Sequence, residues 1–260
     1  MSYFTALNIS HRLFERLKTE NPAWWRFVKD NIKIGDFYVD IRKDNSLNIY
    51  YNGGALLKIT SSKNKINCRI HEYYLGKTGS RYVEYDPNRL PDDANTIKAR
   101  IASRYSNTSE NGIKAKLICD PNTKYIDSEF AYLTTRIDLT KLENDNIIFV
   151  ELKRIEDGRL LTNKYEKGEP KILSQMRAYR QFVNTHKQEI IDYYKILFTI
   201  KHSLGILPQS LSSIENIDNY GLSEDVELYI EPYSLLTAKR EKRIEAIKTI
   251  LNKNNVIHNL

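Results

Sequence analysis

Cysteine is scarce in this chain: Cys68 and Cys119 are the two thiols among 260 residues, and they lie in separate segments. Two thiols are too few for a cysteine-held iron–sulfur cluster or a zinc ribbon, and they indicate no disulfide framework. Long apolar runs are missing as well, since none approaches the roughly 18 residues that span a membrane. The first residues have neither the apolar core nor the cleavage site of a secretory signal. We therefore expect a cytoplasmic protein with no membrane partner.

Two ligand-binding patterns are also missing. The segment Gly76-Lys-Thr-Gly79 lacks the full spacing of a phosphate-binding loop, so we expect an ordinary loop there. The five histidines are scattered without the spacing of metal ligands (His11, His71, His186, His202, His258). Because the phosphate-binding loop of a helicase is missing, any motor would belong to a separate protein.

Positive charge is in surplus, with 40 Lys and Arg against 33 Asp and Glu, for a net charge of +7. A basic surplus favours a polyanionic partner such as nucleic acid, although by itself it is a weak indicator. Hydrophobic residues make up 41% of the chain, enough for a packed core in one large domain or two small ones.

The N-terminal part, residues 1–93, reads as an α+β region. An amphipathic pattern predicts a helix over 5–20. Asn21 as the N-cap and Pro22 as the first helical residue predict the start of a second helix through Trp24 and Trp25. Residues 36–75 predict an antiparallel meander of about four strands, with a tight turn at Asn52-Gly-Gly54. Residues 76–93 predict a loop. This region matches no module that we can name.

The remaining part, residues 94–260, alternates strands and helices. We expect helices over 94–106, 170–186, 187–205 and 238–253, and a polar loop over 156–169. We expect strands over 130–142 and 146–155, joined by a turn at 143–146, and a further strand over 225–236 that is interrupted or ended at Pro232. The expected fold class is therefore α+β or α/β.

A carboxylate and a lysine stand two residues apart in the apolar run Ile147-Ile-Phe-Val-Glu-Leu-Lys153. Alternate residues of a strand share a face, so Glu151 and Lys153 should point the same way, and Asp138 on the preceding strand can reach the same end of the sheet. Two carboxylates and an ammonium suit metal-assisted phosphodiester hydrolysis. A Glu-x-Lys pair is also common on the solvated face of an ordinary strand.

The helix that follows supplies a second pattern. Gln175 and Tyr179 lie four residues apart, so they share one face of the helix predicted over 170–186. Taken alone, Tyr179 could be a core aromatic and Gln175 a solvated residue. Following the acidic strand pair, they favour a shared site.

In this order, Asp138, Glu151-Leu-Lys153 and Gln175-x-x-x-Tyr179 resemble the PD-(D/E)xK nuclease superfamily, in its RecB-like form. The resemblance covers roughly residues 125–235. It implies a restriction-endonuclease-like core, with a mixed central sheet flanked by helices, over 94–260. Ile137 stands where the motif has proline, a replacement that the superfamily often tolerates.

The resemblance also implies roles. Asp138 and Glu151 would bind Mg²⁺ or Mn²⁺, the carbonyl of Leu152 would complete the shell, and Lys153 would serve the attacking water. Glu129 would match an extra upstream acid that many members carry, although Asp127 competes for that role.

Further residues complete the expected site. Gln175 and Tyr179 would steady the metal site or the nucleic-acid backbone, and Arg154, Lys171 and Arg177 are candidates for phosphate contacts. The expected function is a metal-dependent nuclease acting on DNA, either as an endonuclease or as an exonuclease. The alternatives are a non-catalytic nucleic-acid-binding or assembly protein of the same fold, and an RNase that uses the same residues. A homodimer or a partner protein is possible in each case.

Overall fold

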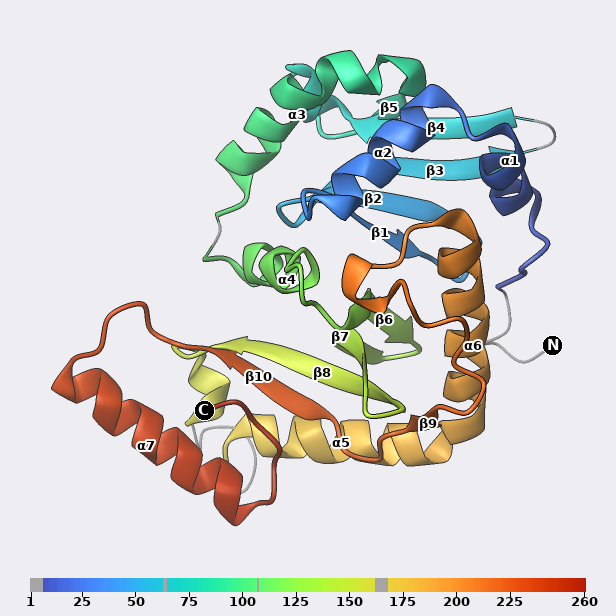
Figure 1. The fold of residues 1–260 in the computed structure, drawn as a ribbon. Helices are drawn as coiled ribbons and strands as arrows, with labels where there is room; N and C mark the ends of the chain where they lie inside the picture. The colour runs from blue at the N-terminus through green and yellow to red at the C-terminus, as the bar shows by residue number, and fades with distance from the viewer. Residues whose placement is uncertain (1–6, 63–64, 107, 162–167) are drawn as a thin grey trace.

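The structure is a computed structural model that describes residues 7–62, 65–106, 108–161 and 168–260. It is a mixed α+β fold in which two sheets lie one above the other, with helices around them (Figure 1). No helix among these described residues is long and apolar enough to cross a membrane.

The first sheet is the antiparallel meander that the sequence predicts, with one strand more. Its strands follow chain order: β1 (Tyr38–Ile41), β2 (Leu47–Tyr51), β3 (Gly54–Ser62), β4 (Lys65–His71) and β5 (Tyr82–Glu84). Gly53 adopts a φ of 78° in the turn between β2 and β3, a conformation that glycine adopts without strain. The short β5 pairs with β4 inside the segment predicted as a loop, so that prediction was wrong there.

Three helices lie beside the first sheet: α1 (Arg12–Glu20) and α3 (Leu90–Arg104) pack against β3, and α2 (Ala23–Lys33) packs against α3. The helix predicted from residue 5 begins later, because the His11 side chain caps α1 by accepting from the Leu13 N–H. Asn21 ends α1 in a left-handed conformation and does not cap α2. α3 begins inside the predicted loop and packs against β3. The predicted division after residue 93 therefore places most of α3 in a different region from the sheet against which it packs.

The second sheet has the order β10-β8-β7-β6, with β9 beside β8. Its strands are β6 (Tyr125–Tyr132), β7 (Thr135–Glu143), β8 (Asn146–Arg154), β9 (Gly221–Leu222) and β10 (Glu227–Glu231). β6, β7 and β8 are antiparallel, whereas β9 and β10 run parallel to β8. The single strand predicted over 130–142 was wrong: Leu133, with a φ of 50°, lies in a turn that separates β6 from β7.

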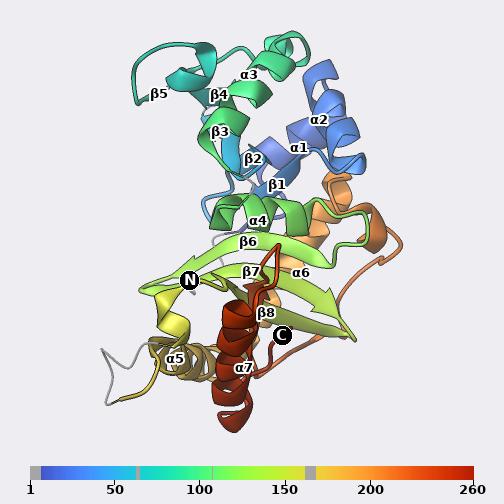
Figure 2. The same ribbon diagram turned by 90° about the vertical axis from the view of Figure 1, so that its left-hand side faces the viewer.

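Helices cover both faces of the second sheet. Figure 2 shows α4 (Glu110–Ile118) above the sheet and α5 (Lys171–Thr185) below it, with α6 (Lys187–Leu204) behind. α6 ends at Gly205 as predicted, and α7 (Ala238–Lys253) follows β10. The sequence did not predict α4, whose Asn111 and Gly112 are poor helix formers. The Ser109 cap and the burial of Ile113 and Ala115 stabilise it.

The two sheets meet where β1 lies beside β6, and one apolar cluster extends through both regions. Residues 162–167 of the predicted polar loop, including Lys164 and Lys167, lie outside the described residues, as do residues 5 and 6 of the first predicted helix.

Candidate active site

Asp138 lies where β7 and β8 stop pairing. The pairing of the two strands begins with Glu143 opposite Asn146 and ends with Leu139 opposite Val150. Asp138 is the next residue of β7. Its carboxylate oxygen Oδ2 accepts a hydrogen bond from the backbone N–H of Leu152 at 3.0 Å. The Asp138 side chain is therefore held against β8 between Glu151 and Lys153, with 23% of its surface exposed.

Glu151 and Lys153 form a buried ion pair at the end of β8. Glu151 is 3% exposed and Lys153 is 2% exposed. The Lys153 ammonium donates to Glu151 Oε1, and it also donates to the Leu152 carbonyl at 2.8 Å. Burial raises the pKa of Glu151 to about 7, and the charge of Asp138 adds to this effect while Lys153 opposes it.

Gln175 and Tyr179 reach this pair from α5. Gln175 Nε2 lies 2.8 Å from Glu151 Oε1 and 2.7 Å from the Tyr179 hydroxyl. The Tyr179 hydroxyl lies 3.1 Å from Glu151 Oε2 and also contacts the carbonyl of Arg136. Burial, and then the charge of Glu151, raise the pKa of Tyr179, so its hydroxyl stays protonated as a donor. Both oxygens of Glu151 are thus held by neighbouring side chains.

Glu129 comes to the same place from β6. The flanking pairs, Ser128 with Leu139 and Phe130 with Ile137, set it opposite Asp138 in the register. Its backbone has a φ of 57°, which is unusual for a residue other than glycine in the middle of a strand. Its carboxylate accepts from the ammonium of Lys114, a residue of α4.

Lys114 is the site residue that the sequence reasoning missed. Its ammonium lies 3.4 Å from Asp138 Oδ1 as well as in contact with Glu129. Burial disfavours the charged form, but the carboxylates of Glu129 and Asp138 outweigh it and raise the pKa of Lys114. The available signal was weak: a serine N-cap at Ser109 before a nine-residue segment that holds a glycine.

Asp127, the alternative to Glu129, belongs to a different cluster. We call it the seam cluster, and it comprises Asp40, Arg42, Asp127, Ser128 and Lys201. Asp40 of β1 accepts from the Ser128 backbone N–H at 3.3 Å, and it lies 3.2 Å from Arg42 and 3.9 Å from Lys201. Burial, with a contribution from the charge of Asp40, raises the pKa of Asp127 to about 7. These residues join the two sheets and do not contact Asp138 in any hydrogen bond or ion pair that the described residues show.

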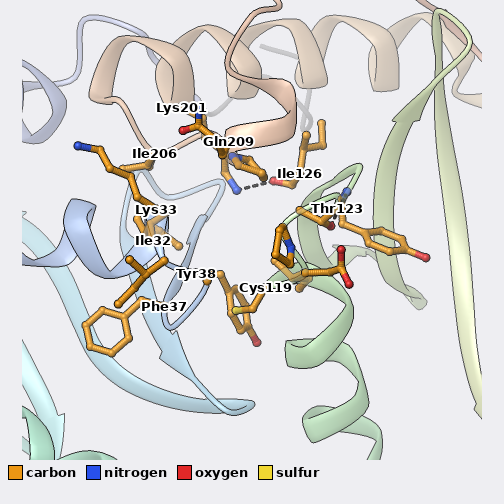
Figure 3. Close-up of a pocket in the computed structure, with 18 of the residues that line it drawn as sticks. Ile32, Lys33, Phe37, Tyr38, Cys119, Thr123, Ile126, Lys201, Ile206 and Gln209 are labelled. Carbon is orange, nitrogen blue, oxygen red and sulfur yellow. Dashed lines mark hydrogen bonds between the residues drawn. The ribbon is translucent and has the colours of Figure 1, made fainter.

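A cavity of about 260 Å³ lies at this junction, apart from the site (Figure 3). Tyr38, Cys119 and Ile126 are among the residues that line it, and Lys201 donates to the Ile126 carbonyl at its wall. Its lining includes neither Asp138 nor Glu151. The carboxylates of the candidate site therefore do not line this cavity.

The three predicted phosphate-contact residues differ in their surroundings. Arg154 is 47% exposed and lies 3.5 Å from Glu156. It lines an open cleft of about 630 Å³ with Arg104 and Glu110. Arg177 is exposed but paired with Glu169, and Lys171 is the exposed first residue of α5.

The oxygens near Glu151 suit a hard cation. Asp138, Glu151 and the Leu152 carbonyl provide the oxygen ligands that Mg²⁺ prefers. The ammonium of Lys153 already donates to two of these groups, Glu151 and the Leu152 carbonyl. Across the part of the chain that the structure describes, no group of three or more His, Cys, Asp or Glu side chains is arranged to hold a metal ion.

Comparison with known proteins gives no further guide, because no family model, no curated protein and no solved structure matches the chain. The arrangement of the site residues is therefore the guide to function.

Proposed function

We propose that this protein is a metal-dependent nuclease that hydrolyses phosphodiester bonds in DNA. The observation that carries the proposal is the position of Asp138, whose carboxylate is bound to the backbone between Glu151 and Lys153. Two carboxylates and an ammonium from adjacent strands thus lie together at the end of the β7–β8 pair.

The oxygens of Asp138, Glu151 and the Leu152 carbonyl fit a divalent ion and would hold Mg²⁺ or Mn²⁺. Such an ion lowers the pKa of a bound water and neutralises charge that develops on the phosphate. The acidic residues would be needed in their ionised form, which the ion favours against the burial of Glu151.

The other side chains would orient these ligands and the substrate. Gln175 and Tyr179 donate toward opposite oxygens of Glu151 and so hold its carboxylate in one orientation. Lys153 would position the attacking water and stabilise negative charge on the phosphate. Each of these groups is on a strand or a helix, which positions a site more firmly than a loop does.

The arrangement of elements supports the same proposal. A mixed sheet with α4 on one face and α5 on the other is what a restriction-endonuclease-like core would require (Figure 2). The site lies where the two inner strands separate, and its side chains come from β7, β8 and α5.

A nucleic acid, with DNA as the form that we propose, is a suitable substrate because the chain has a net charge of +7 and exposed basic residues at the ends of site-bearing elements. Arg154 is the last residue of β8 and Lys171 is the first residue of α5, so both lie at the ends of site-bearing elements. RNA would present the same phosphates, so RNA has to be included in the test.

One observation favours a second candidate, a non-catalytic nucleic-acid-binding protein of the same fold. Each acidic group of the site already has a lysine partner, Lys153 for Glu151 and Lys114 for Glu129 and Asp138. A site neutralised in this way could persist for stability alone.

Incubation with labelled single- and double-stranded DNA and RNA, linear and circular, separates these candidates. We expect cleavage of DNA with Mg²⁺ or Mn²⁺ and none in excess EDTA. Cleavage that continues undiminished in EDTA contradicts metal dependence. Binding without cleavage of any substrate supports the non-catalytic candidate.

A further inference from the structure

The ammonium group of Lys114 lies between two carboxylates of the site, those of Glu129 and Asp138. The lysine is 3% exposed, and its neighbour Ala115 packs in the apolar cluster between α4 and the second sheet. A buried ammonium needs such partners, because an unpaired charge is costly to remove from water. The position of Lys114 is therefore set by α4 and by the two acids together.

Glu129 is in turn held in an uncommon conformation. Its φ of 57° lies in the left-handed region, between two residues that pair normally with β7. Such strain persists only where the surroundings impose it, and it gathers at functional sites. The contact with Lys114 accounts for the direction of the Glu129 carboxylate without any metal.

The two oxygens of Asp138 have separate partners. Oδ1 lies 3.4 Å from Lys114 Nζ, whereas Oδ2 lies 3.0 Å from the Leu152 N–H, on the side of Glu151. A divalent ion shared by Glu129 and Asp138 would lie beside the Lys114 ammonium, and like charges at that separation repel strongly in a partly buried place. The space between Glu129 and Asp138 is therefore already occupied by a positive charge, the ammonium of Lys114.

We propose that Lys114 is a built-in cation of the site, so that the protein binds a single divalent ion, on the Glu151 side of Asp138. In this arrangement Glu129 positions Lys114 and does not bind the metal. Lys114 acts through Asp138 and is a positioning residue. The inference rests on the proposed metal-dependent function and restricts it to one ion.

Calorimetric titration with Mn²⁺ alone, without substrate, tests the inference on the full chain. We expect one ion for the wild type and one for Lys114→Arg, which keeps the charge. Lys114→Met should bind a second, weaker ion, because Glu129 and Asp138 then face each other without a cation. The double variant Lys114→Met with Glu129→Gln should return to one ion. Melting temperatures measured in EDTA show whether each variant folds.

The single variant Glu129→Gln covers the case in which Lys114→Met fails to fold, because the Glu129 side chain is 49% exposed. We expect one ion, with affinity lowered by less than about tenfold, whereas loss of a metal ligand or its direct support costs about 10- to 100-fold. A loss in that range or beyond it means that Glu129 binds the metal or directly supports a metal ligand, and it overturns the inference.

Two results in the wild type distinguish the inference from the proposed function. Two bound ions overturn the inference and leave the metal-dependent nuclease standing. No bound ion overturns both. A folded Lys114→Met variant that still binds one ion with unchanged affinity also overturns the inference.

Discussion

The carboxylate of Asp138 accepts a hydrogen bond from the backbone N–H of Leu152 at 3.0 Å, just beyond the last pair of β7 and β8. A backbone donor does not depend on the neighbouring side chains, so Asp138 keeps its place when Glu151 or Lys153 changes. The same bond can be made to an amide oxygen, which makes asparagine a substitute that preserves the geometry.

Asp138→Asn should therefore fold normally and lose at least about a hundredfold in DNA cleavage, because it removes a charge meant for the metal; a hundredfold corresponds to about 2.7 kcal/mol of transition-state stabilisation. Initial rates in Mg²⁺ measure the effect. Asp145→Asn is the matched control, since Asp145 lies in the β7–β8 turn at the far end of the hairpin. Wild-type rates in Asp138→Asn would remove this residue from the site.

Glu151 should make the metal-free protein less stable as the pH rises from about 4.5 to about 7. Its folded-state pKa of about 7 lies above the ordinary value of 4.5, so the folded state binds more protons in that window. Stability then falls with increasing pH, by up to about 3 kcal/mol for this group. Urea denaturation in EDTA at pH 5 and pH 8 measures the difference.

Glu151→Gln should remove this part of the pH dependence. Asp127, whose pKa is also raised to about 7, contributes in the same direction. The relevant quantity is therefore the change in unfolding free energy between pH 5 and pH 8 in the wild type minus the same change in the variant. An unchanged difference between pH 5 and pH 8 in Glu151→Gln would mean that Glu151 titrates normally.

Gln175→Ala should lower the cleavage rate by about tenfold or more, equivalent to about 1.4 kcal/mol, with little change in melting temperature. The amide donates to Glu151 Oε1 at 2.8 Å, so its loss leaves that oxygen held by the Lys153 ammonium alone. Tyr179→Phe removes the hydroxyl and keeps the ring packing, so it tests whether the hydroxyl contributes to the cleavage rate. If both variants cleave at the wild-type rate, the helix α5 supplies structure only, and the RecB-like placement loses its main support.

Arg154→Ala should weaken DNA binding and reduce the slope of log K against log salt by about one, because each neutralised phosphate releases about one counterion. Fluorescence anisotropy across a salt series gives the slope. Arg16→Ala removes the same charge from α1, far from β8 in the chain, and should leave the slope unchanged. Equal slopes for Arg154→Ala and the wild type would place Arg154 outside the DNA contact surface.

Asp40→Ala should destabilise the protein by about 3–5 kcal/mol, because it leaves the buried charges of the seam cluster unbalanced. Asp40 is 1% exposed and lies within ion-pair distance of Arg42 and Lys201. Chemical denaturation measures the change. Asp30→Ala, at a side chain that is 70% exposed, should cost less than about 0.5 kcal/mol. A small effect of Asp40→Ala would show that the two sheets are joined by apolar packing alone.

Local pattern was enough for much of the second half of the chain. The alternation in β8 predicted that Glu151 and Lys153 share a face, and the spacing of four in α5 predicted that Gln175 and Tyr179 do. The structure brings these four side chains together with Asp138, although their catalytic roles remain predictions. Strand period and helix period are properties of neighbouring residues, so sequence alone reveals them.

Contacts between distant segments were decided by the tertiary structure. Lys114 lies on a helix with weak local signals and gains its place from Glu129, 15 residues away, and from Asp138, 24 residues away. The positions of Asp127 and Glu129 were also decided in three dimensions: Asp127 lies in the seam cluster with Asp40, whereas the carboxylate of Glu129 contacts Lys114. A buried charge is tolerated only where a partner from elsewhere in the chain meets it, and no local pattern specifies that partner.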